Sequence, residues 1–271
     1  MARRRLLLVA AGGVAIGVAT VTGRGGGLLA PSALDEGPHS GPIRQPAKTA
    51  ATRSAKPERA VRRASNVPPA RTADHMSGQP MYYVDDGPHV IALTIDDGPS
   101  PVYTPQVLSI LEKYGITATF SMVGQNVSYY PSIAREVADA GHTIVNHTWN
   151  HANLTSMKWS RLPDEVDRAT AEIQSATGKR PEMFRAPYGA WSRTLLEYCA
   201  SEKLTPVDWS VDPKDWTRPG ISKIVKTILG TTKTGSIILE HDGGGDRSQT
   251  VAALKIVIPR LIDEGYQFTV P

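Results

Sequence analysis

The stretch VIALTIDDGPS, residues 90–100, joins six apolar or β-branched residues to two adjacent carboxylates and a Gly-Pro pair. A short apolar run that ends at turn residues predicts a buried strand. Comparable strand-like runs follow along the chain: TATFSMV (117–123), TIVNH (143–147), EMFRA (182–186), LTPVDWSV (204–211), SIILEH (236–241) and QFTV (267–270).

Amphipathic stretches separate these runs. We expect helices over residues 105–114, 132–140, 164–176, 194–203, 221–229 and 251–264. About seven alternations of strand and helix predict an α/β fold, with a parallel sheet closed or nearly closed into a (β/α) barrel. An open doubly wound sheet is the alternative. In both architectures the functional site lies at the C-terminal ends of the strands.

Polar residues stand at those strand ends. Asp96 and Asp97 follow ALTI, and they can share one cleft only if the backbone turns, because neighbouring side chains on a regular strand face opposite sides. His147 follows TIVN, and His151 comes four residues later in NHTWNH. Two imidazoles at this spacing can converge on one ion from a helical turn or a tight loop. A carboxylate from another strand end would complete a two-His, one-carboxylate set with open positions for catalysis.

The remaining strand ends offer acid–base and charge-stabilising groups. Arg185 in FRAPYG can pair with a carboxylate, and the following turn offers backbone N–H groups for an oxyanion. His241 in ILEHD is a candidate general acid, and Asp215 in DPKDW can orient it. Each residue alone also fits a structural role, such as a surface ion pair or a buried histidine, so the prediction depends on their combination.

In order, the motifs TIDDGP, HTWNH, RAPYG, DPKDW and LEH resemble those of the NodB-like polysaccharide deacetylases, carbohydrate esterase family four. The resemblance spans about residues 90–270 and implies a distorted (β/α) barrel. One departure is Ile95, where the family usually has phenylalanine. The roles that the resemblance implies are these: Asp96 the catalytic base, Asp97, His147 and His151 the metal ligands, Arg185 the partner of the base, Tyr188 an oxyanion donor through its backbone N–H, Asp215 and Trp216 the support of His241, His241 the general acid, and Leu239 a wall of the acetyl pocket.

The expected activity is metal-dependent removal of N-acetyl groups from N-acetylglucosamine units of a cell-wall polysaccharide, through a metal-activated water. Zinc is the first choice of ion, and cobalt, nickel or manganese suit the same ligands. Peptidoglycan leads as substrate, ahead of chitin or chitooligosaccharides. The alternatives are an acetyl-xylan esterase of the same fold and a catalytically silent wall-binding protein.

Two further classes share parts of this pattern. A glycosidase needs two carboxylates at least ~5 Å apart across a sugar bond, which neighbouring residues serving one ion and its water do not provide. An iron oxygenase can use the same two-His, one-carboxylate ligand set. Acetate release without oxygen would exclude the oxygenase.

The N-terminal part differs in composition from the rest. MARRRLLLVAAGGVAIGVATVTGR, residues 1–24, has the order of an export signal, and we expect residues 1–33 to be a cleaved signal or a membrane anchor. Residues 34–80 are rich in Ala, Pro and Arg and predict a disordered basic linker. Residues 81–271 are then the catalytic domain, and the protein is exported, either secreted or tethered at the cell surface.

Charge and cysteine content limit the other functions. Residues 1–80 carry 12 Lys/Arg and 4 Asp/Glu, whereas residues 81–271 carry 18 and 22. The basic pI therefore belongs to the linker and does not indicate nucleic-acid binding. Cys199 is the single cysteine, so no intramolecular disulfide can form, and its helical spacing from Leu195 and Leu196 predicts a core position. No obligate protein partner is evident.

Overall fold

The computed structural model describes residues 78–271. The expected export segment and nearly all of the expected linker lie outside these residues. The last three residues of the expected linker, 78–80, are described. Pro80 is buried, directly before the expected domain start at Met81. None of the helices between residues 78 and 271 is long and apolar enough to cross a membrane.

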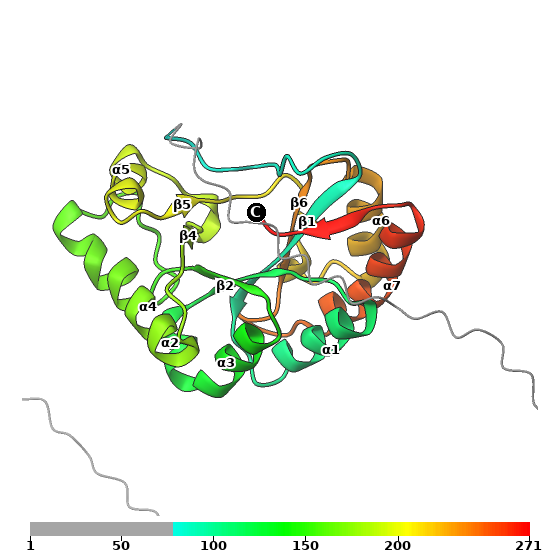
Figure 1. Ribbon diagram of the computed structural model, residues 1–271, viewed down its shortest axis with the longest axis horizontal. Helices are drawn as coiled ribbons and strands as arrows, with labels where there is room; N and C mark the ends of the chain where they lie inside the picture. The colour runs from blue at the N-terminus through cyan, green and yellow to red at the C-terminus, as the bar shows by residue number, and fades with distance from the viewer. Residues whose placement is uncertain (1–77) are drawn as a thin grey trace, which may run out of the picture. The chain divides into compact units, whose positions relative to one another are not determined.

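Within the described residues, strands and helices alternate as the sequence predicts (Figure 1). The strands are β1 (Val90–Gly98), β2 (Thr119–Met122), β3 (Thr143–Asn146), β4 (Met183–Phe184), β5 (Thr205–Pro206), β6 (Ile237–His241) and β7 (Gln267–Thr269). The α-helices are α1 (Thr104–Tyr114), α2 (Gly124–Tyr129), α3 (Pro131–Asp139), α4 (Leu162–Thr177), α5 (Arg193–Ser201), α6 (Ile221–Thr231) and α7 (Ser248–Asp263). Three single 3₁₀ turns are η1 (Trp159–Arg161), η2 (Pro187–Gly189) and η3 (Asp215–Thr217).

The strands form one parallel sheet in the order β5-β4-β3-β2-β1-β6, and β7 pairs with the start of β1. β5 lies at one edge, yet Val211, a few residues beyond it, forms a parallel bridge with Ile238 of β6 at the other edge. This bridge curls the sheet toward closure, so the barrel is confirmed and the open sheet is not formed. β4 and β5 are only two residues long, which makes the barrel irregular on that side.

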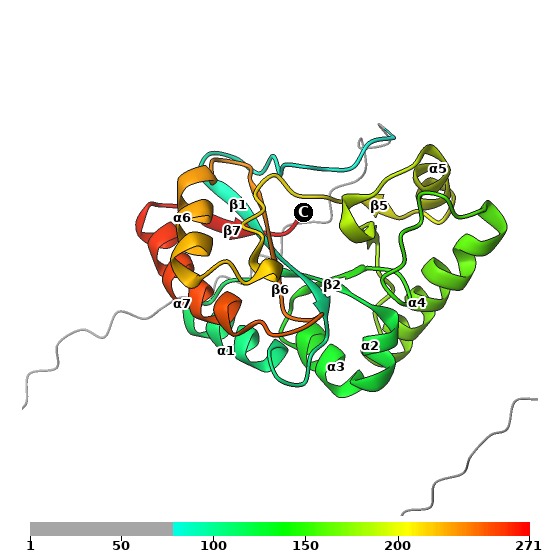
Figure 2. The same cartoon turned by 180° about the vertical axis from the view of Figure 1, so that it is seen from behind.

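The helices lie outside the curled sheet, as Figures 1 and 2 show from opposite sides. β1 is buried along almost its whole length, as expected for a central strand of a curled parallel sheet. Ile95 is fully buried, as expected for a packing position. Cys199 is also fully buried, in a second cluster around Phe184 and Leu195.

Local signals in the sequence explain the ends of several helices. Pro105 opens the first turn of α1, where its missing N–H costs no hydrogen bond, and Gly115 ends the helix with a left-handed φ of 62°. Ser192 caps α5 by accepting a hydrogen bond from the Leu195 N–H at 3.2 Å.

Candidate active site

Asp96 and Asp97 face the same site because the backbone turns at Asp97 itself. Asp97 has a left-handed φ of 73°, and the register between β1 and β2 shifts between Asp96 and Gly98. The sequence predicted a turn caused by Gly98 and Pro99, after the two carboxylates. The structure places it one residue earlier, as an irregularity within the strand.

The Asp97 carboxylate meets both predicted histidines. Its Oδ1 lies 3.5 Å from Nε2 of His147 and 3.2 Å from Nε2 of His151. One ligand atom from each of the three residues lies within 4.8 Å of the other two. His147 directly follows β3, and His151 reaches the same point from a tight loop with a left-handed φ of 63°. The structure thus brings together the three residues predicted as metal ligands.

The surroundings of this cluster fit a divalent cation. Nδ1 of His147 lies 2.8 Å from the carbonyl oxygen of Arg185, and a carbonyl can only accept, so Nδ1 carries the proton and Nε2 keeps its lone pair. Asp97 Oδ1 is buried and has no hydrogen-bond donor among the described residues. Two imidazole nitrogens and one carboxylate oxygen suit zinc and similar ions.

Charge at the cluster follows its geometry. Burial opposes the ionisation of Asp97, but the close contact with the His147 imidazole and the influence of His241 and His151 outweigh it and hold the Asp97 pKa well below its usual range. Burial lowers the pKa of His151, with Asp97 acting in the opposite direction. The environment thus favours the anion at Asp97, and burial favours the neutral imidazole at His151.

Asp96 forms an ion pair with Arg185 at the bottom of the site. Nη1 of Arg185 lies 2.7 Å from Asp96 Oδ1, and both side chains are buried. The same nitrogen donates to Thr94 Oγ1 at 2.8 Å, and Nη2 donates to the Asp208 carbonyl at 2.9 Å. Sequence patterns predicted the pair but not Thr94 or Asp208, which lie in other segments and hold the guanidinium in place.

Asp215 and His241 form the second predicted pair. Nδ1 of His241 lies 2.7 Å from Asp215 Oδ1, and the His241 backbone N–H donates to Asp215 Oδ2 at 3.0 Å. Burial lowers the His241 pKa, but the hydrogen bond and charge of Asp215 outweigh it and raise the pKa to about 9. His241 pairs in register with Asp96 across β6 and β1, so the acid and base candidates stand on adjacent strand ends.

Tyr188, Trp216 and Leu239, the other residues with predicted roles, differ in exposure. Tyr188, with a left-handed φ of 64°, is 67% exposed, and its hydroxyl lies 3.2 Å from Nδ1 of His151. Trp216 is also exposed. Leu239 is buried on β6, two residues before His241 and on the same face of the strand. The role of Leu239 in an acetyl pocket stays a prediction.

A glycine loop that the sequence analysis did not single out packs against Asp97. A Cβ built on Gly244 would lie 2.7 Å from Asp97 Oδ2 and 3.2 Å from Nη2 of Arg247. Arg247 is buried and donates to the Gly243 carbonyl at 2.6 Å, which ties the loop down. The run GGG in the sequence was the available signal, but only the fold shows that it lies on a metal-ligand candidate.

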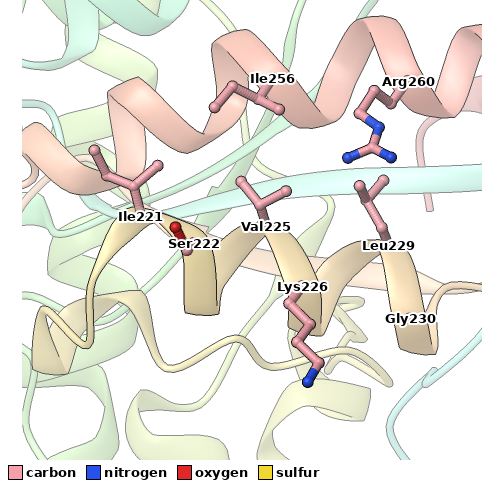
Figure 3. Close-up of a pocket in the computed structure, with 8 residues that line it drawn as sticks. All are labelled: Ile221, Ser222, Val225, Lys226, Leu229, Gly230, Ile256 and Arg260. Atoms are coloured by element: carbon pink, nitrogen blue, oxygen red, sulfur yellow. The ribbon is translucent and has the colours of Figure 1, made fainter.

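Two hollows among residues 78–271 have linings that include none of the three cluster residues. One runs between α6 and α7 and is lined by Ile221, Val225, Leu229 and Ile256 with Lys226 and Arg260 at its edges (Figure 3). The other lies between residues 79–83 and Thr205–Pro206.

The fold is an α/β barrel, and its strand ends bring the Asp96–Arg185 and Asp215–His241 pairs together with a cluster that could bind a metal. A model of the polysaccharide deacetylase family matches residues 83–207. A chitooligosaccharide deacetylase of Bradyrhizobium sp. (strain ANU 289) is 39% identical over 193 residues, covering 67% of this chain and 88% of that protein. A peptidoglycan-N-acetylglucosamine deacetylase of Bacillus cereus is 38% identical over 194 residues, covering 71% and 91%.

A solved structure gives the same result. The crystal structure of a peptidoglycan N-acetylglucosamine deacetylase, in complex with 4-naphthalen-1-yl-N-oxidanyl-benzamide, is similar with a TM-score of 0.68 and 31% identity. The similarity covers 70% of this chain and 89% of that one. This chain belongs to the polysaccharide deacetylase family, as its motifs predicted.

Proposed function

We propose that this deacetylase is metal-dependent and removes N-acetyl groups from N-acetylglucosamine units of a cell-wall polysaccharide. The observation that carries the proposal is that three groups of residues meet at neighbouring strand ends: the Asp97, His147 and His151 cluster, the Asp96–Arg185 pair and the Asp215–His241 pair. Peptidoglycan and chitooligosaccharides are the substrates in the names of the relatives, and both contain this acetamide.

Asp97, His147 and His151 would hold the ion. A bound divalent cation supplies Lewis-acid polarisation of the acetamide carbonyl and lowers the pKa of water. The protein residues perform the other tasks. Asp96 accepts the proton of the attacking water, and Arg185 fixes the orientation of that carboxylate through its 2.7 Å bond. The Tyr188 backbone N–H stabilises the negative oxygen that develops on the acetamide.

Bond cleavage needs an acid because an amine anion is a poor leaving group. Nδ1 of His241 is engaged by Asp215, so Nε2 is the nitrogen that delivers a proton to the sugar amine. Asp215 holds this orientation in the manner of other carboxylate–histidine pairs. An ester releases a better leaving group, so the acid favours an amide over an acetyl-xylan substrate.

Peptidoglycan is our first choice of polymer, with chitin or chitooligosaccharides second, because residues 1–33 resemble an export segment and residues 34–80 a basic tether. We propose an exported enzyme, secreted or held at the surface. Zinc is the proposed ion, with cobalt, nickel or manganese as alternatives.

The test is acetate release from peptidoglycan, chitooligosaccharides and acetyl-xylan, assayed in parallel with and without a chelator. We expect release from the N-acetylated polymers and its loss with chelator. No acetate from any polymer would favour a silent wall-binding protein. A preference for acetyl-xylan would reverse the assignment to amide substrates.

A further inference from the structure

Glu240 is a buried acid that the proposed reaction does not use. It lies on β6 between Leu239 and His241, so its side chain points to the face opposite theirs. In register it pairs with Ile95 of β1, and both residues are fully buried. Neither carboxyl oxygen of Glu240 has a hydrogen-bond donor among residues 78–271. A buried carboxylate without a donor is costly, so this arrangement needs an explanation.

The partner of Glu240 is another carboxyl group, that of Asp215. The two side chains lie within hydrogen-bonding reach of each other. Two carboxylates only accept hydrogen bonds, and the contact becomes a bond only when one of them carries a proton. Asp215 is in turn bound to His241, and this connects Glu240 to the proposed acid.

The donors around the pair decide which carboxyl is protonated. Asp215 accepts from the backbone N–H and Nδ1 of His241 at 3.0 and 2.7 Å, and from Thr250 Oγ1 at 2.6 Å. Three donors favour the anion at Asp215, and the absence of donors favours the neutral acid at Glu240. A carboxylate has about four acceptor sites, so a protonated Glu240 would fill the fourth.

The charges that face Glu240 agree with this assignment. Burial has the largest effect on the Glu240 pKa, and the charges of Asp215 and Asp212 act in the same direction. Together they raise this pKa well above its usual range. Arg247 acts in the opposite direction and is too weak to reverse it. Burial opposes the ionisation of Asp215, but its bond with His241 and the bonds from Glu240 and Thr250 lower the Asp215 pKa overall.

We propose that Glu240 is a neutral carboxylic acid that donates a hydrogen bond to Asp215 and thereby positions the Asp215–His241 pair. It is a positioning residue, since Asp215 and His241 lie between it and the substrate. The expected effect on deacetylation rates rests on the proposed function. The protonation of Glu240 is independent of that function. A carboxyl group kept neutral by an apolar site so that it can donate is an established device in enzymes.

Two variants separate this role from a general structural one. Glu240→Gln keeps the shape and a donor without any charge, whereas Glu240→Met keeps the volume and removes the donor. We expect Glu240→Gln to deacetylate chitooligosaccharides within about threefold of the wild type and with the same pH profile. Loss of a hydrogen bond of ordinary strength in Glu240→Met should lower kcat on the amide by about tenfold and leave an activated acetyl ester nearly unchanged.

An infrared difference spectrum at pH 7 between wild type and Glu240→Gln tests protonation without any turnover. We expect the carbonyl band of a protonated carboxylic acid in the wild type and its loss in the variant. The inference is overturned if that band is absent, if Glu240→Gln shifts the pH profile, or if both variants lose the same activity. If the wild type releases no acetate, the proposed function fails, and the infrared band still decides whether Glu240 is protonated.

Discussion

Gly244→Ala should weaken metal binding although Gly244 is not a ligand. The added Cβ would lie 2.7 Å from Asp97 Oδ2, about 0.7 Å short of the 3.4 Å at which ordinary contact begins. A carboxylate is rigid, so pushing Oδ2 also moves Oδ1, the oxygen that faces both histidines. Metal sites tolerate distance errors of about 0.2 Å, so a shift of this size should be several times too large.

A matched control is available at Gly178. Both glycines have left-handed φ angles, +69° at Gly244 and +75° at Gly178, so alanine at either costs roughly 1–2 kcal/mol of backbone strain. A Cβ at Gly178 meets nothing within 4 Å. Both variants should therefore lose thermal stability through backbone strain, but only Gly244→Ala should change the metal site.

The assay is competition for Zn²⁺ against a chromophoric chelator, with thermal unfolding measured on the same samples. We expect at least a tenfold loss of affinity in Gly244→Ala, by analogy with the 10–100-fold that supporting residues of metal sites contribute. Gly178→Ala should bind within about twofold of the wild type. Equal affinities in the two variants would refute the contact argument, and with it the role of the glycine loop in holding Asp97.

Three other outcomes are expected. Asp96→Asn should retain one ion per chain and lose about 10²–10⁴-fold in turnover, whereas Asp97→Asn should lose the ion, as metal analysis beside acetate release will show. A metal-free Asp96→Asn would contradict the division of roles. Burial raises the Asp242 pKa from 3.8 to about 7, with a Thr104 hydrogen bond acting against this shift and the charge of Asp97 adding to it. The folded protein therefore favours the protonated Asp242, and the stability that this gives is lost as pH rises from about 4 to 7. Denaturant unfolding of metal-free protein should then show Asp242→Asn gaining stability relative to wild type from about pH 4 to 7, and a constant difference would contradict it. Burial raises the Cys199 pKa to about 12, so iodoacetamide should label this thiol at pH 8 only after unfolding, and rapid native labelling would place it at the surface.

Much of the fold could be predicted because the strands are short apolar runs and the helices are amphipathic. β1 and α1 agree with their sequence signals to within a few residues. α2 was not predicted, since its six residues give too little periodicity before Pro131 begins the next helix. The residues of the EMFRA and LTPVDWSV runs supply only two-residue strands, because curling of the barrel decides how much of each run pairs.

The candidate site could be predicted as far as it follows from strand ends and recognisable motifs. Local patterns could not reveal contacts between segments distant in the sequence. The left-handed turn at Asp97, the approach of Gly244 to its carboxylate, and the Glu240–Asp215 contact all depend on packing between β1, β6 and their loops. Glu240 in particular stands within an apolar run that predicts only a buried strand, and its charge state follows from neighbours that the run does not contain.

The central claim is that Asp97, His147 and His151 hold one ion on which deacetylation depends. The most direct test strips the protein of metal and then titrates Zn²⁺ back while acetate release from a chitooligosaccharide is measured. Activity should be lost on stripping, rise in proportion to added zinc and level off at one equivalent per chain, and Asp97→Asn should show no such rise. Full acetate release from the stripped protein, or a plateau unrelated to one equivalent, would contradict the account.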